Sequence, residues 1–137
     1  MERTLTIVKP DAVAAGRAGA ILAHLEKEGF QFIGLRRMRL GTDQARAFYS
    51  VHRERPFYDA LVRFMTEGPV VVAALQRADA VAHLRKTMGA TDSRKADAGT
   101  VRNLYGTDIE RNAIHGSDSA ENAAKEIAFF FGEAELL

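Results

Sequence analysis

The sequence predicts an α/β domain, an α+β sandwich in which helices cover a single sheet. Three observations point to this fold class. Segments with the apolar alternation of strands take turns along the chain with segments of helical periodicity. The 137 residues are about enough for one domain, and no linker, repeat or low-complexity segment divides them. Hydrophobic residues make up 47% of the chain, which argues against a disordered protein.

The composition excludes several classes of function. The net charge is +1, from 19 basic and 18 acidic residues, so we expect no specific nucleic-acid partner. Cysteine is absent, which removes disulfides, thiolate catalysis and thiolate metal sites. No run approaches the length of a membrane span, and the first residues resemble a strand rather than a signal peptide. We therefore expect a cytoplasmic protein with no membrane partner.

The first strand is predicted over residues 4–9, where apolar and threonine side chains alternate. Lys9 closes the row that faces the core, and Pro10 ends the strand because proline has no N–H to donate. A lysine at the mouth of a core-facing row is unusual for a solvated charge. Since ligands often bind near strand ends, we interpret Lys9 as a functional residue.

The alternation of helix and strand continues through the next segments. A helix with apolar positions between residues 18 and 25 is expected to stop at Gly29. A strand follows over residues 30–40, with a bulge or strong twist near Gly34, where the alternation slips. The next helix begins after Gly41, and we expect Thr42 to be its N-cap.

Tyr49 and His52 lie on the same side of that helix as two apolar residues. They are an unusual pair to bury, although His52 alone can equally be an ordinary, satisfied polar residue. A short helix then follows with one apolar face, made of Phe57, Leu61, Phe64 and Met65.

The second half of the chain begins with an uninterrupted apolar run over residues 70–75, typical of a central strand buried on both faces. Asp79 opens a helix in which Arg85 lies beside the apolar stripe, so its side chain can reach a cleft. Residues 89–111 show no sustained period. A loop of this length inside a domain is commonly functional, and we expect one helical turn within it, at residues 101–105.

The stretch Asn-Ala-Ile-His-Gly-Ser-Asp-Ser, residues 112–119, precedes the clearest amphipathic helix of the chain, at residues 120–131. Ser117, Asp118 and Ser119 are all good N-cap residues, and Asp118 and Glu121 have the spacing of a capping box. The helix would therefore begin beside His115 and direct its free N–H groups and positive dipole nearby, which suits a histidine that handles phosphate. A strand-to-helix turn without any chemistry is the alternative.

This order of elements, with helical crossovers in two connections, fits a ferredoxin-like, split βαβ fold. We expect a four-stranded, mainly antiparallel sheet covered by helices, and a single domain over residues 1–137.

The polar residues of the expected pocket favour phosphate chemistry. No serine occupies a nucleophile elbow, and no two histidines have metal-ligand spacing. Arginine binds phosphate by a two-pronged fork and lysine as a point charge, while a neutral imidazole is a competent nucleophile near pH 7. The pocket candidates are Lys9, Tyr49, Arg85, Arg102 and His115.

Five motifs occur in order along the chain: Thr-Leu-Thr-Ile-Val-Lys-Pro-Asp-Ala-Val (4–13), Arg-Pro-Phe (55–57), Gly-Pro-Val-Val (68–71), Gly-Thr-Val-Arg (99–102) and Asn-Ala-Ile-His-Gly-Ser-Asp-Ser (112–119). Through them the chain resembles the nucleoside diphosphate kinases over essentially its whole length. The resemblance implies that the γ-phosphate of a nucleoside triphosphate passes to a nucleoside diphosphate, which maintains nucleoside triphosphate pools. The route would be ping-pong, through a phosphohistidine formed at the δ nitrogen of His115.

The resemblance also implies contacts with the sugar and the base. Lys9 and Asn112 would contact the sugar hydroxyls, and Lys9 would also contact the transferring phosphate. Phe57 would stack on the base, with Leu61 extending that shelf. Stacking accepts any π-face, which fits the family's indifference to base identity.

Other matched residues would bind the phosphates. Arg85, Thr91 and Arg102 would hold the β- and γ-phosphates, with His52 near the α and β groups. Mg²⁺ would arrive with the nucleotide and bridge its phosphates, since the sequence offers no carboxylate cage for a metal.

The remaining matched residues would serve the nucleophile. Tyr49 would help to position the phosphate at His115. Ser117 and Glu126 would orient and support His115, although Glu126 can also be interpreted as a solvated helix residue. The family further implies a homo-oligomer, a tetramer or a hexamer.

The match departs from the family in the loop after Thr91. Family members usually have two prolines there, at the places of Ser93 and Ala98, and an aspartate at the place of Leu104. A lost loop proline raises the entropy cost of ordering by several tenths to about 1 kcal/mol per site. We therefore expect a less rigid loop and altered subunit contacts.

Two other functional classes fit the sequence less well. A binding or regulatory module that had lost turnover would be expected to replace His115 or Lys9, and both are present. A nucleic-acid-binding split βαβ protein would need exposed aromatics on its sheet and an excess of basic residues, neither of which is evident.

Overall fold

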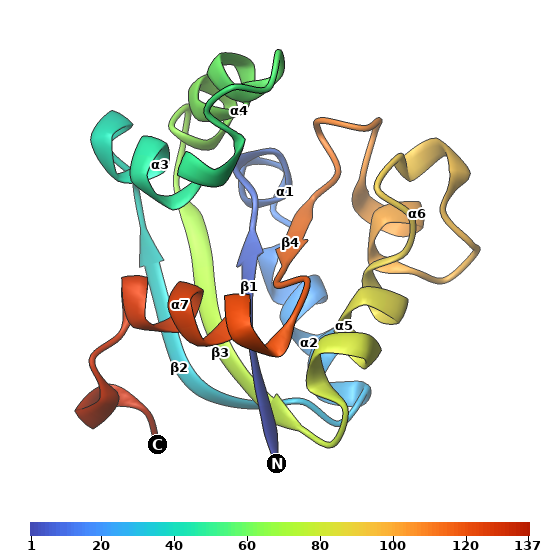
Figure 1. Ribbon diagram of the computed structural model, residues 1–137. Helices are drawn as coiled ribbons and strands as arrows, with labels where there is room; N and C mark the ends of the chain where they lie inside the picture. The colour runs from blue at the N-terminus through green and yellow to red at the C-terminus, as the bar shows by residue number, and fades with distance from the viewer.

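The computed structural model describes residues 1–137 and contains one four-stranded sheet in the order β2-β3-β1-β4 (Figure 1). The strands are β1 (Glu2–Val8), β2 (Gln31–Met38), β3 (Val70–Arg77) and β4 (Ile114–Gly116). All three neighbouring pairs are antiparallel. The predicted ferredoxin-like architecture is confirmed.

Seven α-helices surround the sheet, and three short 3₁₀ turns accompany them. The helices are α1 (Pro10–Ala14), α2 (Ala18–Lys27), α3 (Thr42–Phe48), α4 (Tyr58–Met65), α5 (Ala80–Met88), α6 (Val101–Tyr105) and α7 (Ala120–Phe130). The turns are at Ser50–His52, Ser93–Lys95 and Glu133–Glu135. None of the helices is both long enough and apolar enough to cross a membrane.

Each face of the sheet has its own apolar core. On one face, side chains of β1, β2 and β3 pack against α3, α4 and α7. On the other face, β1, β3 and β4 pack against α2 and α5, with contributions from α1 and α6 (Figure 1). Because β1 and β3 lie between two cores, their central residues are fully buried, as the apolar run at residues 70–75 predicts.

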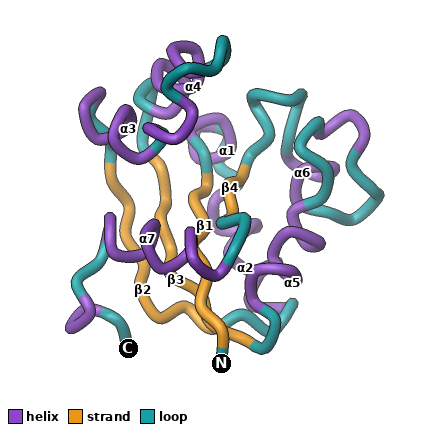
Figure 2. The backbone as a smooth tube through the Cα atoms, in the orientation of Figure 1, coloured by secondary structure: helices purple, strands orange, loops and turns teal.

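The predicted bulge in the second strand is present. The pairing of β2 with β3 shifts register between Phe32 and Gly34. A Cβ added at Gly34 would lie 3.0 Å from the Phe131 ring, so this position tolerates little more than a hydrogen atom. The short helix predicted at residues 101–105 is also present, as α6, within the long connection between α5 and β4 (Figure 2).

Several local predictions are wrong. Pro10 does end the strand, but it also occupies the first position of α1, a helix that the sequence analysis missed. The N-cap of α3 is Gly41 rather than Thr42, and its N–H donates to the Gln44 side chain. Of the three N-cap candidates before α7, Ser119 is the N-cap, and its Oγ accepts from the Asn122 N–H at 3.0 Å, so the capping box of Asp118 with Glu121 is not formed.

The apolar face assigned to α4 needs one correction. Phe57 is not buried with the rest of that face, since half of its surface is exposed and it lies at the N-cap position of the helix. Val62, Phe64 and Met65 make the buried contacts instead.

Candidate active site

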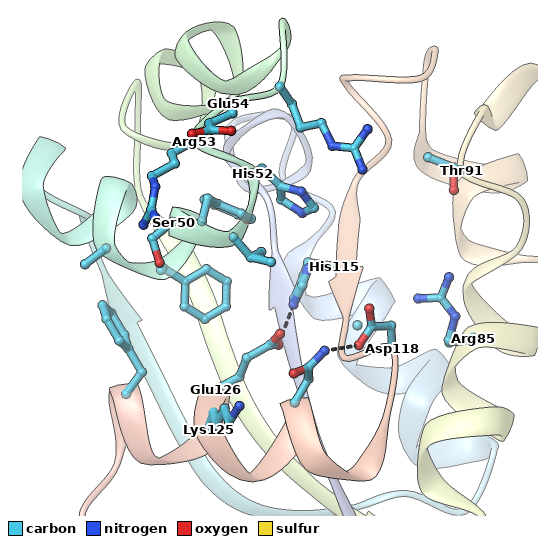
Figure 3. Close-up of a pocket in the computed structure, with 18 of the residues that line it drawn as sticks. Ser50, His52, Arg53, Glu54, Arg85, Thr91, His115, Asp118, Lys125 and Glu126 are labelled. Carbon is cyan, nitrogen blue, oxygen red and sulfur yellow. Dashed lines mark hydrogen bonds and ion pairs between the residues drawn. The ribbon is translucent and has the colours of Figure 1, made fainter.

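A cleft of about 1040 Å³ opens beside β4, between the segment from α3 to Arg55 and helix α7 (Figure 3). Arg85, Thr91 and Arg102 line its opposite side. Five cationic residues and three carboxylates line it in all: Arg53, Arg55, Arg85, Arg102, Lys125, Glu54, Asp118 and Glu126. This excess of positive charge suits an anionic ligand.

His115 enters the cleft from β4, the shortest strand. Its backbone pairs with Ile7 of β1, and its carbonyl accepts a hydrogen bond from Thr6 Oγ1 at 2.8 Å. Glycine follows it, and a Cβ on Gly116 would lie 2.7 Å from the sulfur of Met88 and force the α5 side chains to shift. This close approach lets α5 pack directly beneath the histidine.

The imidazole of His115 is oriented by a chain of hydrogen bonds that leads from the cleft into the core. His115 Nε2 lies 2.7 Å from Glu126 Oε1 (Figure 3). Ser117 Oγ donates to the same carboxylate oxygen at 2.9 Å. Ser117 Oγ in turn accepts from the Leu5 N–H at 3.2 Å. Because a carboxylate only accepts, this geometry places the imidazole proton on Nε2 and the lone pair on Nδ1.

Glu126 is therefore held at the site rather than solvated. Its side chain is 21% exposed and accepts from two groups. A carboxylate in this position stabilises positive charge on the ring and fixes its tautomer.

Two aromatic rings flank the histidine. Phe48 and Tyr49 present their edges to the His115 ring, with centroid separations of 5.5 and 6.3 Å. The hydroxyl of Tyr49 is buried and has no hydrogen-bond partner. Burial, helped by the negative charge of Glu126, raises the pKa of Tyr49. The hydroxyl is therefore a donor that the protein itself leaves unused.

Lys9 lies behind the cleft, one residue past the end of β1. Its Nζ donates to Asn112 Oδ1 at 2.8 Å, and Asn112 Nδ2 donates to the Thr91 carbonyl at 3.0 Å. Burial and, second to it, the positive charge of Arg102 lower the pKa of Lys9 to about 8, although the negative charges of Asp11 and Glu110 oppose the shift. Lys9 can thus lose its proton within a modest rise in pH.

Between Asn112 and His115 the backbone makes a strained turn. Ala113 has φ +73°, and the Ile114 N–H donates to the Asn112 carbonyl at 2.9 Å, which closes a three-residue γ-turn. A non-glycine residue in this conformation costs about 1–3 kcal/mol, which the surrounding structure has to offset.

The arginines on the far side differ in their environments. Arg85 is exposed on α5. Arg102 is buried and donates to the carbonyls of Gly89 and Ile114 at 3.0 and 2.8 Å, while its Nε has no partner. Burial, and then the charge of Arg85, lowers the pKa of Arg102 to about 10. The two charges together make this wall of the cleft cationic.

Most of the predicted site residues converge on this region. Seven line the cleft: Tyr49, His52, Arg85, Thr91, Arg102, His115 and Glu126. Three lie buried behind it, Lys9, Asn112 and Ser117. Phe57 and Leu61 do not line it, although the Phe57 ring lies 5.3 Å from that of His52. Leu61 packs against the core beneath α4.

Some lining residues were not predicted from the sequence, including Asn122, Lys125 and Phe129 of α7. Their spacing of three, four and seven residues places them on one helix face with Glu126, so assigning Glu126 to the site could have identified them. Arg55 was also missed, although it belongs to the Arg-Pro-Phe motif.

Comparisons with known proteins agree on one family. A sequence model of the family "Nucleoside diphosphate kinase" matches residues 2–136. A protein named nucleoside diphosphate kinase from Acidiphilium cryptum is 55% identical over 136 residues, covering 99% of this chain and 97% of the relative. Another with that name, from Persephonella marina, is 47% identical over 137 residues, 100% of this chain and 98% of the relative.

Solved structures give the same result. The nucleoside diphosphate kinase of Aquifex aeolicus superposes with a TM-score of 0.97 at 48% identity, and 99% of each chain is covered. The enzyme of Halobacterium salinarum, solved in complex with CDP, superposes with a TM-score of 0.95 at 43% identity, covering 99% of this chain and 91% of that one.

Proposed function

The chain belongs to the nucleoside diphosphate kinase family of phosphotransferases, and from this premise we propose that His115 carries the phosphoryl group in a ping-pong reaction. The observation that carries the proposal is the contact between His115 Nε2 and Glu126. It leaves the Nδ1 lone pair available to attack phosphorus.

In the first half-reaction, Nδ1 of His115 attacks the γ-phosphorus of a nucleoside triphosphate. The bond from that phosphorus to the β–γ bridging oxygen breaks, and the nucleoside diphosphate leaves with the electron pair. In the second half-reaction, a β-phosphate oxygen of another nucleoside diphosphate attacks the same phosphorus, and the N–P bond breaks. Glu126 stabilises the charge on the ring while Nδ1 is phosphorylated.

The cationic wall of the cleft would bind the phosphates. Arg85, Thr91 and Arg102 are the proposed ligands of the β- and γ-phosphates, with His52 near the α- and β-phosphates. The Nε of Arg102, buried and unpartnered, is one donor available for this purpose. The unused hydroxyl of Tyr49 is proposed to position the transferring phosphate at His115.

The sugar and the base would extend away from His115. Lys9 and Asn112 are proposed to contact the sugar hydroxyls, and Lys9 also the transferring phosphate. Phe57, half-exposed beside His52, is proposed to stack on the base together with Leu61. A stacking platform does not discriminate between bases, which suits an enzyme that serves several nucleotide pools.

Mg²⁺ is proposed to bind with the nucleotide. No group of three or more histidine, aspartate or glutamate side chains in the structure could hold a metal ion by itself. The phosphates would therefore supply most of its ligands, and the ion would neutralise part of their charge.

We also propose that the protein works in the cytoplasm as a homo-oligomer, a tetramer or a hexamer. Leu104 and Ile109, at the end of α6 and in the loop that follows, have 51% and 60% of their surface exposed. Large apolar side chains exposed in one loop are suited to burial against a second subunit.

The phosphohistidine is testable by labelling. Incubation with γ-labelled ATP and Mg²⁺ should give a phosphoprotein that is stable to base, labile to acid, and discharged by any nucleoside diphosphate. His115→Asn should abolish the label. His24→Asn is the matched control, because His24 lies on α2 outside the cleft lining, and it should label normally.

Label that survives in His115→Asn would refute the mechanism. A protein that binds nucleotides but never becomes labelled would instead be a binding module that has lost turnover.

A further inference from the structure

The motif Lys9-Pro10-Asp11 contains a carboxylate that the proposed mechanism does not use. Asp11 lies in the first turn of α1, and its Oδ2 accepts a hydrogen bond from the Ala113 N–H at 3.1 Å. Its other carboxylate oxygen, Oδ1, is buried and has no hydrogen-bond partner. A buried carboxylate oxygen without a donor is unusual and calls for an explanation.

We propose that Asp11 is a positioning residue that holds the strained turn at Ala113 and provides the counter-charge for Lys9, so that Asn112 and Lys9 keep their places beside His115. This inference rests on the proposed function, because it concerns residues of the same site.

The hold on Ala113 comes from both of its polar backbone groups. Its N–H donates to Asp11, and its carbonyl accepts from the Lys9 N–H at 2.8 Å. Ala113 itself is fully buried, so water cannot replace these partners. A residue with a side chain keeps a γ-turn at positive φ only when surrounding contacts hold it in that conformation. These two hydrogen bonds are such contacts for Ala113.

The turn matters because of what it joins. On its C-terminal side, Ile114 and His115 are already fixed by their pairing with Val8 and Ile7 of β1. On its N-terminal side, Asn112 has no strand to hold it and depends on the turn and on its side-chain contacts. Release of the turn would therefore move Asn112 and its partner Lys9 more than the nucleophile.

The charge of Asp11 acts on Lys9 through space, since the Lys9 ammonium donates to Asn112 and forms no ion pair with Asp11. Burial and Arg102 favour the neutral amine, whereas the negative charges of Asp11 and Glu110 favour the protonated form. Burial raises the pKa of Asp11 itself, while the backbone N–H groups of Ala12 and Ala113 and the charge of Lys9 oppose that shift. Removing the Asp11 charge would leave Lys9 to lose its proton at a lower pH.

Two substitutions separate the hydrogen bond from the charge. Asp11→Asn keeps an acceptor for the Ala113 N–H but removes the charge. It should move the alkaline limb of kcat/KM down by about half a unit to one unit, with a KM for nucleotide near that of the wild type at about pH 6, where Lys9 is protonated in both proteins. Asp11→Ala removes both and should also raise KM by about tenfold, with a smaller fall in kcat.

The role of the turn is tested by making Asp11→Ala in a protein that already carries Ala113→Gly. Glycine adopts positive φ without strain, so the same turn needs less support. The increase in KM caused by Asp11→Ala should therefore be smaller in this background than in the native one. Glu26→Gln, which removes a carboxylate from the exposed face of α2, is the charge control and should change neither KM nor the alkaline limb.

The outcomes distinguish this inference from the proposed function. An active wild type whose KM and alkaline limb are unaffected by both Asp11 substitutions would overturn the role of Asp11 alone. An equal effect of Asp11→Ala in both backgrounds would overturn its hold on the turn. A wild type that never labels at His115 would overturn the proposed function instead.

Discussion

Replacing Tyr49 by phenylalanine should make the protein more stable and phosphoryl transfer slower. The Tyr49 hydroxyl is buried without a hydrogen-bond partner, although its ring packs edge-on against Phe48 at 4.9 Å. Phenylalanine keeps those ring contacts and removes the unsatisfied oxygen. Because its pKa is raised by burial, the hydroxyl stays protonated and available to a phosphate oxygen over the working pH range.

The size of the effect follows from the cost of an unsatisfied group. A buried hydroxyl without a partner costs about 1–3 kcal/mol, so its removal should recover about 1 kcal/mol or more. For 137 residues at about 2.1 cal/mol/K each, the entropy of unfolding is roughly 0.3 kcal/mol/K. Tm should therefore rise by about 3 °C or more. A lost hydrogen bond to a charged phosphate, worth about 1.5–3 kcal/mol, should slow labelling of His115 by about 10- to 100-fold.

Tyr58→Phe is the matched control, and its expected effect on stability is opposite to that of Tyr49→Phe. The Tyr58 hydroxyl donates to the Arg46 carbonyl at 3.0 Å, so its loss should lower stability by about 0.5–1.5 kcal/mol and leave the labelling rate unchanged. Urea unfolding and Tm at one protein concentration, with quenched-flow labelling, measure both quantities. If Tyr49→Phe were destabilised as much as Tyr58→Phe, the Tyr49 hydroxyl would have a partner in the folded protein and the reasoning would be refuted.

Three further predictions concern the same region. The folded-state pKa of Lys9, about 8, lies below its ordinary value of 10.5, so the unfolded chain binds more protons between these pH values. The free energy of unfolding should thus rise with pH from about 8 to 10, by at most about 1.4 kcal/mol per unit, and Lys9→Met should flatten that slope in urea titrations. Ser117→Ala removes a donor to Glu126 and leaves a backbone N–H unsatisfied, so it should cost about 1–3 kcal/mol in urea unfolding and slow labelling. Ala98→Pro should raise stability by about 0.4–1 kcal/mol, because the Ala98 N–H has no hydrogen-bond partner to lose. Ser93→Pro should not raise it, because the Ser93 N–H donates to a carbonyl across the loop at 3.3 Å. Equal gains in Tm from the two prolines would contradict this account.

The sheet was predictable because a short run of residues in a strand already shows which faces of that strand are buried. The apolar run at residues 70–75 has the signature of a strand between two cores, and β3 has that position. The slip in alternation at Gly34 likewise predicted the shift in register. These patterns reflect burial, because the residue type at each position of a strand depends on whether that position faces a core or the solvent.

Helix starts were harder to predict because neighbouring residues compete for the same role. Ser117, Asp118 and Ser119 can all cap a helix, and sequence spacing favoured Asp118. In the structure, the Ser117 hydroxyl donates to Glu126, and the Asp118 carboxylate accepts from the Asn122 side chain at 2.6 Å. Only the Ser119 hydroxyl is left to cap α7. Tertiary contacts therefore decide which oxygen is free.

The site was predictable to the extent that its residues lie in distinctive motifs. His115 and Lys9 were identified from local pattern, and they lie at the site. Asp11 stands two residues from Lys9, yet its contact with Ala113 joins residues 102 positions apart. No local sequence pattern predicts a contact over this distance, so the role of Asp11 can be inferred only from the folded structure.

The pairing of β1 with β4 also has a consequence for biosynthesis. Ile7 and His115 are neighbours in the sheet although more than a hundred positions separate them. At about 5–20 residues per second, the ribosome completes β4 roughly 5–20 s after β1. Throughout that interval the apolar residues of β1 have no partner on one edge and depend on the ribosome or a chaperone to stay apart from other chains. His115, Ser117 and Glu126 all lie in or after β4, so the nucleophile and the two residues that orient it are among the last parts of the site to be synthesised.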